Sequence, residues 1–363
     1  MQAFLNGSDI TQYCQQITWR PKLSRPAMAK VKVPARALTV SAGQDELALT
    51  EGGTLFTGDV FYPQYDGTAD SAYAEITAYD HLIALKDRMV KSSLGNLITP
   101  TSAALDAPGM FAEYINNTIA VDPGSYALAV GSVAAGGVDV DVSSLMQFPM
   151  DLEQLRALLV GTGQMDVFLS PGTGTSTVNL TNGDGGTDLS GSVSYEYATG
   201  SFNATVGQLT VDMSEVINAL WYLLAPRVSR ERYKGSITPT APHVGGSWPP
   251  ALLADIALSR GLYNYRQEIQ TKDEVGANGI RPYYEARWAS EAGLRTFPRH
   301  FYSVKPNRGV FPAFVPGDLI TVSAGSVLNG GFTEAQRVYE FEVVTDQDGI
   351  NQVTDILTSA DQE

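Results

Sequence analysis

The side chains that most often supply a nucleophile, a general base or a zinc ligand are few in this sequence. Its three histidines, His81, His243 and His300, are widely separated, and its one cysteine is Cys14. Zinc sites need clusters of His and Cys, and a catalytic thiol needs a histidine partner. A lone cysteine forms no disulfide within its chain, so we expect Cys14 to be a small buried hydrophobic residue. The G-x-S-x-G turn of many serine hydrolases and the Gly-Lys-Ser/Thr phosphate loop are both absent from the sequence.

Acidic residues offer other chemistry. Asp139 and Asp141 alternate with valines and share one face of a predicted strand, where they could bind a metal. A strand with one solvated face explains the pair fully, and we favour that interpretation. The triplet at 66–68, Asp-Gly-Thr, has the residues of an aspartic-protease signature in the wrong order. The segment 346–349, Asp-Gln-Asp-Gly, begins like a calcium loop, but no Glu completes the EF-hand spacing, so we expect a hairpin turn.

Any acidic chain contains carboxylate pairs, so a two-carboxylate glycosidase stays open as an alternative. From the residues alone we assign no catalytic, cofactor-binding or metal-binding residue, and we expect no enzyme and no cofactor.

Composition narrows the classes of function further. The 363 residues carry a formal net charge of −15, and Glu231 interrupts the densest basic stretch, 227–234. Phosphate backbones are bound by clustered Lys and Arg, which argues against tight nucleic-acid binding. Hydrophobic residues make up 44% and charged residues only 17%, which predicts real cores and a surface partly covered by a partner. We expect no signal peptide, because the first residues, MQAFLNGSDITQYC, show no basic region followed by an apolar one. We expect no membrane span, because no stretch approaches about 20 apolar residues.

The elements that must position any site are mainly strands. Alternating or apolar runs predict strands in the first ninety residues at 17–20, 30–33, 55–62 and 73–80, with a helical turn at 81–89. Five or six strands of this kind form a small barrel or sandwich.

The middle of the chain is mixed, and the composition changes near Ser92. Helices are predicted at 108–119 and 151–161, and strands at 138–142, 165–169, 177–180 and 195–198, with a glycine-rich loop at 182–191.

The last third returns to strands around one irregular segment. The Pro- and Gly-rich segment 239–250 is predicted to be an exposed loop, with Trp248 as a local anchor. Short helices are predicted at 249–261 and 283–294, and strands at 209–224, from 299 onward, and at 319–322, 337–345 and 351–357.

Three stretches, in order along the chain, resemble the baseplate hub or tail-tip hub proteins of long-tailed bacteriophages, which are related to the contractile-phage hub and the late-control tail proteins. The first joins GTLFTGDV at 53–60 to AEITAYDHLIALKDR at 74–88, and is similar to the family's G-x-x-x-F-x-G-x-V … A-x-D-x-x-x-L-x-x-R run. The second is the segment 212–223, acidic and then apolar. The third joins FVPGDLITV at 314–322 to RVYEFEV at 337–343. The segment 239–250 has no counterpart in the family pattern.

The resemblance implies a mainly β fold with α+β insertions: two tube-type β-barrels plus smaller peripheral domains. It implies a first barrel at 1–92, a peripheral α+β domain at 93–200, and a second barrel at 201–363 with a loop or helical insertion around 235–295. It further implies a homotrimeric ring in the virion tail tip, with assembly in the host cytoplasm. Expected partners are the distal tail protein ring, the tape-measure protein and tip, spike or receptor-binding proteins, while DNA passes through the channel without specific binding.

Two other functions stay open. A tail protein that binds host-surface carbohydrate would use exposed Trp and Tyr side chains to stack on sugar rings. A tail-associated cell-wall hydrolase or protease would need catalytic motifs, and the usual ones are missing from this sequence.

Overall fold

The fold is given by a computed structural model of the chain. It describes residues 1–67, 72–97, 106–121, 128–135, 150–161, 165–172, 174–183, 185–197, 203–212, 219–224, 234–237, 267–272, 299–306, 311–324 and 332–359. Strands dominate these residues, with a few helices, and the predicted mainly β class with small helical insertions is confirmed.

Seven antiparallel strands from residues 2–80 form one part of the main sheet, which we call its N-terminal half. In spatial order they are β3-β4-β7-β6-β5-β1-β2, and their bounds along the chain are β1 Gln2–Leu5, β2 Ser8–Asp9, β3 Gln16–Arg20, β4 Met28–Pro34, β5 Glu46–Thr50, β6 Thr54–Asp66 and β7 Tyr73–Asp80. A single 3-10 turn, η1 (Thr11–Tyr13), follows β2.

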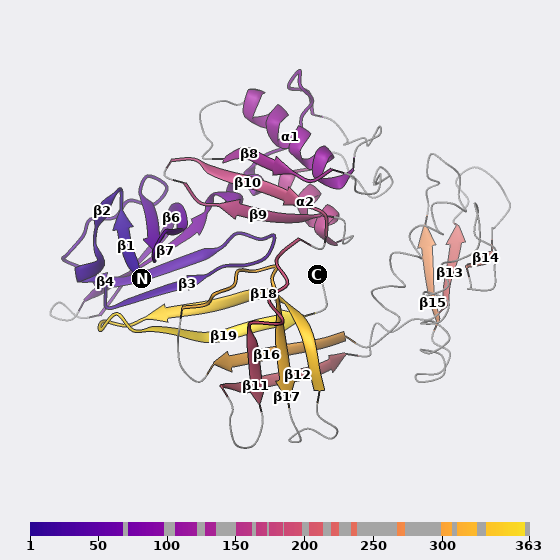
Figure 1. Ribbon diagram of the computed structural model, residues 1–363. Coiled ribbons are helices and arrows are strands. Elements are labelled where there is room, and N and C mark those ends of the chain that lie inside the picture. Colours follow the sequence, from indigo (N-terminus) through magenta and orange to yellow (C-terminus); the bar gives the residue numbers. More distant parts are fainter. Residues whose placement is uncertain are drawn as a thin grey trace.

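Strands from the C-terminal part extend the same sheet (Figure 1). They run in the order β12-β16-β19-β18, with β17 and β11 branching from β18, and their bounds are β11 Ser194–Tyr197, β12 Ala204–Asp212, β16 Arg299–Pro306, β17 Leu319–Ala324, β18 Phe332–Thr345 and β19 Asn351–Ser359. The two halves are joined where β18 pairs with β3, in the register Val343↔Trp19 and Thr345↔Ile17. The described strands of both halves therefore make one continuous sheet, and closure of either half into a tube-type barrel stays a prediction.

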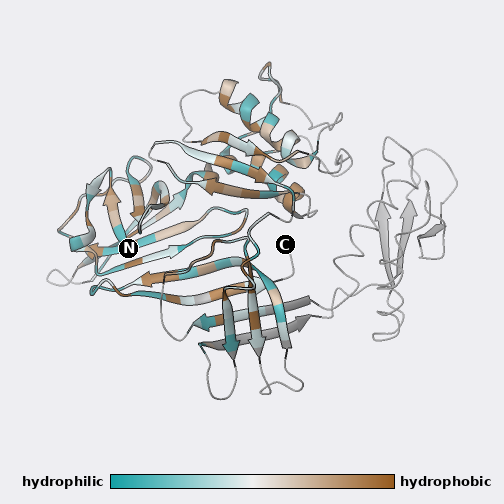
Figure 2. Cartoon of the chain, viewed as in Figure 1, coloured by the Kyte–Doolittle hydropathy of each residue, from teal (hydrophilic) through white to brown (hydrophobic). Residues whose placement is uncertain are grey.

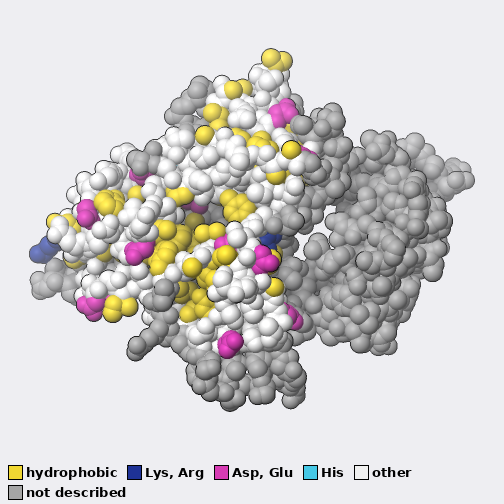
Figure 3. Space-filling view, viewed as in Figure 1, with side chains coloured by type: hydrophobic (Ala, Val, Ile, Leu, Met, Phe, Trp, Pro, Cys, Tyr) yellow, Lys and Arg dark blue, Asp and Glu magenta, His cyan; other side chains and the backbone are white. Residues whose placement is uncertain are grey.

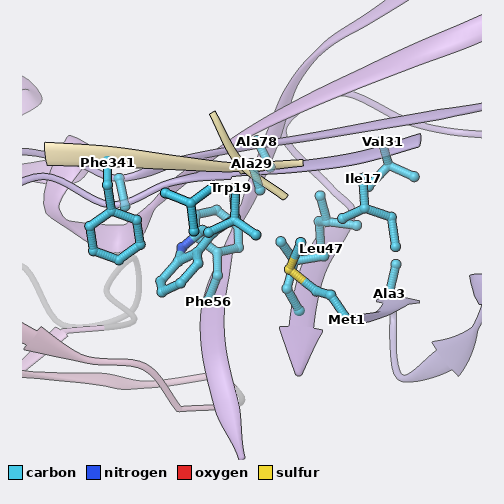
Figure 4. Packing of buried hydrophobic residues seen from close by; sticks show 14 of the residues in the cluster. Met1, Ala3, Ile17, Trp19, Ala29, Val31, Leu47, Phe56, Ala78 and Phe341 are labelled. Atoms are coloured by element: carbon cyan, nitrogen blue, oxygen red, sulfur yellow. The ribbon is translucent and has the colours of Figure 1, made fainter. Parts of the chain in front are cut away.

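Alternation along the strands gives this sheet its core. In β4, Ala29, Val31 and Val33 are buried while Lys30 and Lys32 face outward, and the hydropathy of the strands alternates in the same way (Figure 2). A period of two is what a strand with one covered face requires. Phe341 of the C-terminal half packs edge-on against Trp19 of the N-terminal half, inside one shared hydrophobic cluster (Figure 4).

A smaller α/β unit, which we call the insert, lies between these halves in the sequence. Its three-stranded sheet has the order β8-β10-β9, with β8 parallel and β9 antiparallel to β10. Two helices and the preceding 3-10 helix complete it, and the bounds are η2 His81–Asp87, α1 Ala107–Val121, β8 Leu128–Val133, α2 Leu152–Gly161, β9 Asp166–Ser170 and β10 Ser176–Thr181. Phe111, Leu155 and Val178 belong to a second hydrophobic cluster that is separate from the first.

A third sheet has the order β14-β13-β15, with bounds β13 Ala219–Leu224, β14 Lys234–Ile237 and β15 Gln267–Lys272. The apolar segment predicted to hold one or two strands at 209–224 therefore contributes β12 and β13, in two different sheets. The predicted strand 138–142 with Asp139 and Asp141, the loop 239–250 with Trp248, and the helices 249–261 and 283–294 lie outside the described residues. The three-part domain division stays a prediction.

Candidate functional site

The residues most able to do chemistry are separated in the structure. His81 begins η2 and is buried, and His300 lies in β16, while His243 falls outside the described residues. Cys14 is half-buried, and its thiol donates to the Ile10 carbonyl at 3.3 Å. Burial, with the nearby carboxylate of Asp9, raises the pKa of Cys14 to about 12, so it stays a thiol at neutral pH.

One arrangement that the sequence did not reveal brings a histidine and a serine together. Nδ1 of His81 lies 2.8 Å from Oγ of Ser176, and Nε2 of His81 lies 3.9 Å from Oε2 of Glu46. The three residue types are those of a serine-hydrolase triad. Ser176 has no exposed surface and His81 is 2% exposed, so a substrate carbonyl has no route to the hydroxyl. His81 and Ser176 are 95 residues apart, and no local pattern marks them as partners.

The acidic side chains of the segments 66–68 and 346–349 that the structure describes form hydrogen bonds within turns and between neighbouring strands. Oδ1 of Asp346 accepts hydrogen bonds from the backbone N–H of Asp348 and of Ile350, at 3.0 and 2.9 Å. These bonds make the predicted hairpin turn between β18 and β19, so the prediction is confirmed. Asp66 accepts from the Tyr73 hydroxyl at 3.0 Å and from the backbone N–H of Gly67. Within the described ranges, no group of three or more His, Cys, Asp or Glu side chains could hold a metal ion.

The most developed polar site is a buried junction between the insert and the C-terminal strands. Its centre is Arg337 of β18, whose guanidinium contacts Oδ2 of Asp166 of β9 at 2.5 Å. The same guanidinium donates to the carbonyls of Gly317 and Gly183, at 3.1 and 2.9 Å, and to the carbonyl of Gly185. Asp166 is fully buried, so this charge is held inside the protein by its cation and by the backbone N–H of Gly185.

The Pro316-Gly317-Asp318 turn closes this junction. Gly317 has φ of +104°, and a Cβ there would lie 2.8 Å from the ring of Phe168. Asp318 uses both carboxylate oxygens, accepting from the backbone N–H of Thr187 at 2.7 Å and of Val315 at 2.8 Å. The turn therefore fixes the loop before β11 as well as the start of β17.

The N-terminal half is tied to the insert at Ser24. Oγ of Ser24 accepts from the backbone N–H of Val167 at 2.9 Å, and the Ser24 carbonyl accepts from Arg156 of α2. Ser24 has φ of +55°, a conformation that non-glycine residues rarely adopt. Arg156 also contacts Glu153 one turn earlier on its helix, at 2.5 and 2.7 Å. Three segments of the chain are thus held together by buried polar contacts.

One outward-facing region of the described surface is rich in aromatic side chains. We call it the aromatic ribbon, residues 61–66 of β6 with 73–79 of β7. Phe61, Tyr62 and Tyr65 are 37%, 61% and 55% exposed. Phe61 packs edge-on against Tyr79 at 5.4 Å, and the ammonium of Lys32 lies 3.8 Å above the Tyr73 ring. Exposed aromatic side chains of this kind are enriched at protein interfaces.

On the face shown in Figure 3, acidic side chains are scattered and basic ones are few, while hydrophobic side chains gather near the centre. Of the helices in the described part of the chain, none is both long enough and apolar enough to cross a bilayer.

Comparison with known proteins adds a fold. No family model matches the sequence, and no curated protein matches it. A tail protein from Neisseria meningitidis MC58 matches 99% of this chain and 96% of its own, with 10% identity and a TM-score of 0.59. A 43 kDa tail protein of prophage MuSo2 from Shewanella oneidensis matches 98% and 97%, with 12% identity and a TM-score of 0.58.

The chain has the fold of phage tail proteins. Prophage tail protein gp18 from Listeria monocytogenes EGD-e is similar as well, over 100% of this chain and 95% of its own, with 10% identity and a TM-score of 0.56.

In this phage tail fold, two of the three stretches that carried the sequence resemblance form pairs of neighbouring strands in the main sheet. The segments 53–60 and 74–88 become the paired strands β6 and β7, followed by η2. The segments 314–322 and 337–343 become the paired strands β17 and β18 and the turn at the buried junction. The segment 212–223 spans residues outside the described ranges between β12 and β13.

Proposed function

We propose that this chain is a structural hub of a bacteriophage tail tip or baseplate and not an enzyme. The observation that carries the proposal is the likeness in fold to three tail proteins, over at least 98% of this chain and 95% of each of theirs. Each match covers this chain and the similar protein almost end to end, so little of either compared chain is left for a separate catalytic domain. The closed surroundings of Ser176 and His81 agree with a role that is not catalytic.

The proposed assembly is a homotrimeric ring in the virion. The two barrels proposed for each chain would give six in a trimer, which suits an adaptor between a sixfold tail tube with its distal tail protein ring and a threefold tip or spike. The ring would enclose a channel for the tape-measure protein and DNA. A net charge of −15 supports this role, because an acidic wall repels DNA and does not bind it.

Rigidity and an available contact surface support an assembly role. The junction at Arg337 and Asp166 and the contacts of Ser24 hold the insert on the sheet, so the chain presents its surfaces in a fixed geometry. The aromatic ribbon supplies large side chains, which contribute strongly to affinity once they are buried at an interface.

The test is the mass and shape of the assembled protein. The full chain should be measured by mass photometry, alone and after co-expression with the products of the neighbouring tail genes, and imaged by electron microscopy. We expect particles of three chains of 38.9 kDa each, with a central hole. Monomer alone under both conditions, with no ring in the images, would refute the hub.

Binding of host-surface carbohydrate is the second candidate, favoured by the exposed rings of Tyr62 and Tyr65. A glycan array or host cell-wall pull-down with the isolated chain distinguishes it. Saturable binding that is lost on replacing both tyrosines, together with a monomeric protein, would support this candidate over the hub.

A further inference from the structure

The hairpin between β9 and β10 is held on the N-terminal sheet by a compact set of polar contacts around His81. Besides the Ser176 contact at 2.8 Å, Oγ1 of Thr57 donates to the Gly172 carbonyl at 3.2 Å and lies 3.4 Å from Oγ of Ser176. The backbone N–H of Gly172 donates to the same Oγ at 3.4 Å, and that of Gly174 donates to Oε2 of Glu46 at 3.2 Å.

These contacts connect two units that have separate hydrophobic clusters. Thr57 lies in β6 and Glu46 in β5, whereas Ser176 begins β10 of the insert. His81, Thr57 and Ser176 are almost completely buried. Nε2 of His81 is also buried, and no hydrogen-bond partner reaches it from the described residues. The imidazole therefore lies between the two units, with Nδ1 in contact with Ser176 and Nε2 3.9 Å from the carboxylate of Glu46.

We propose that His81 is an acid-sensitive clasp, which holds the β9–β10 hairpin against β5 and β6 while it is neutral and releases the hairpin when it is protonated. A neutral imidazole contacts the Ser176 hydroxyl through Nδ1 and leaves the buried Nε2 without a hydrogen bond, at moderate cost. A protonated imidazole places a full charge in the same buried position, where the Glu46 carboxylate, 3.9 Å from Nε2, offsets only part of the cost of burial.

The direction of the pH dependence follows from the groups around His81. Burial lowers the pKa of His81, against the opposing influence of Asp59 of β6 and Glu46 of β5. The segment 171–177 of the hairpin carries no charged residue, and Glu153 and Arg156 of α2, which packs on η2, contact each other. A histidine with a lowered pKa stabilises the closed state above its ordinary value near 6.5, and this stabilisation is lost as the pH falls below that value.

Asp80, the residue before His81, contributes a pH dependence of stability with the opposite sign. Burial raises the pKa of Asp80 to about 7, although the backbone N–H groups of Ala27 and Leu82 donate to its carboxylate. Its contribution to stability is present below its ordinary pKa of 3.8 and is lost as the pH rises through 7. Both donors lie outside the hairpin, so release of the hairpin leaves the partners of Asp80 in place.

The test is hydrogen exchange on the full chain between pH 8 and pH 5, read by mass spectrometry and corrected for intrinsic exchange rates. We expect the protection of peptides covering 165–181 to fall several-fold below pH 6.5, while β4 keeps its protection. In His81→Gln, which retains a hydrogen-bonding side chain that does not titrate, this fall should vanish. In Asp80→Asn it should persist.

A second variant keeps the test decisive if His81→Gln does not fold. Glu46→Gln keeps an oxygen for the Gly174 N–H but removes a charge that favours the imidazolium. The pH at which half of the protection of 165–181 is lost should therefore be lower in this variant than in the wild type. Equal protection of 165–181 across the pH range in the wild type would overturn the clasp. So would an unmoved midpoint in Glu46→Gln, or loss of the pH effect in Asp80→Asn.

Discussion

At Gly58 the central strands of the N-terminal sheet approach each other so closely that only a hydrogen atom fits on Cα. A Cβ at this position would lie 2.0 Å from the carbonyl oxygen of Tyr79, on the paired strand β7. Backbone atoms cannot rotate away as a side chain can, so the pairing itself would have to open. The glycine in the FTGDV stretch is therefore a requirement of sheet packing at a single residue.

We predict that Gly58→Ala lowers the free energy of unfolding by about 3 kcal/mol, because it forces strain on the buried β6–β7 pairing. Chemical denaturation followed by circular dichroism measures the change.

The matched control for this substitution is Gly53→Ala, in the turn before β6. A Cβ at Gly53 meets nothing within 4 Å, so its effect should stay within about 0.5 kcal/mol. Similar losses for the two variants would contradict the close-approach explanation.

At the scale of elements, Arg337 and Asp166 join β18 to β9. Removing one member of a buried ion pair leaves the other charge without compensation, which costs about 3–5 kcal/mol. We predict a loss of this size for Arg337→Met in urea unfolding. Adding Asp166→Asn should recover part of it, because the amide no longer brings a buried charge but still offers an oxygen to the Gly185 N–H.

A surface pair provides the comparison for this double substitution. Arg20 contacts Glu340 at 2.5 Å, but the arginine is 39% exposed and Lys22 also reaches Glu340, at 3.2 Å. Arg20→Met should therefore cost less than about 1 kcal/mol. If Arg337→Met is no worse than Arg20→Met, the junction does not hold the insert in place.

Elements with a strong period were predictable from the sequence. The alternation in β4 and β7 and the leucine spacing of α2 are local patterns, and the structure confirms the strands and the helix. The Pro316-Gly317-Asp318 turn was also predictable from a local pattern. It needs only a proline, a glycine with positive φ and an aspartate that accepts a backbone hydrogen bond from Val315.

Contacts between distant segments were not predictable. Arg337 meets Asp166 across 171 positions, and His81 meets Ser176 across 95. Neither pair has a spacing that a helix or hairpin would impose, so only the assembled fold brings the residues together. The short strands β1 and β2 were missed for a related reason, because runs of four and two residues are too short to show a clear period.

At the scale of the molecule, continuity of the main sheet is the central property. β3 and β18 come from opposite ends of the chain and pair with each other, so both halves share one core. A force on one half is transmitted to the other through backbone hydrogen bonds and packed side chains. This rigidity suits a protein whose proposed task is to hold neighbours in fixed positions.

The aromatic ribbon gives the assembly proposal a molecular prediction. Beyond Val60, β6 pairs only with β7 among the described strands, and Pro63 weakens that free edge as a site for strand addition. We therefore expect another chain to associate with this region through side-chain contacts and not through strand addition. Replacing Tyr62 and Tyr65 by serine should raise the dissociation constant of the trimer at least about tenfold, since buried aromatic anchors typically contribute more than 1.4 kcal/mol. Sedimentation velocity over a concentration series measures this constant.

The same double variant separates assembly from folding. Both tyrosines are more than half exposed, so the urea midpoint of the monomer should stay unchanged. Ile350→Ser, at the β18–β19 turn, removes an apolar side chain that is 61% exposed, as Tyr62 is, and should leave association unaffected. If the tyrosine variant trimerises like the wild type, the ribbon is not the contact between copies. If both variants weaken association equally, general loss of exposed apolar surface explains the effect, and the ribbon has no specific part in it.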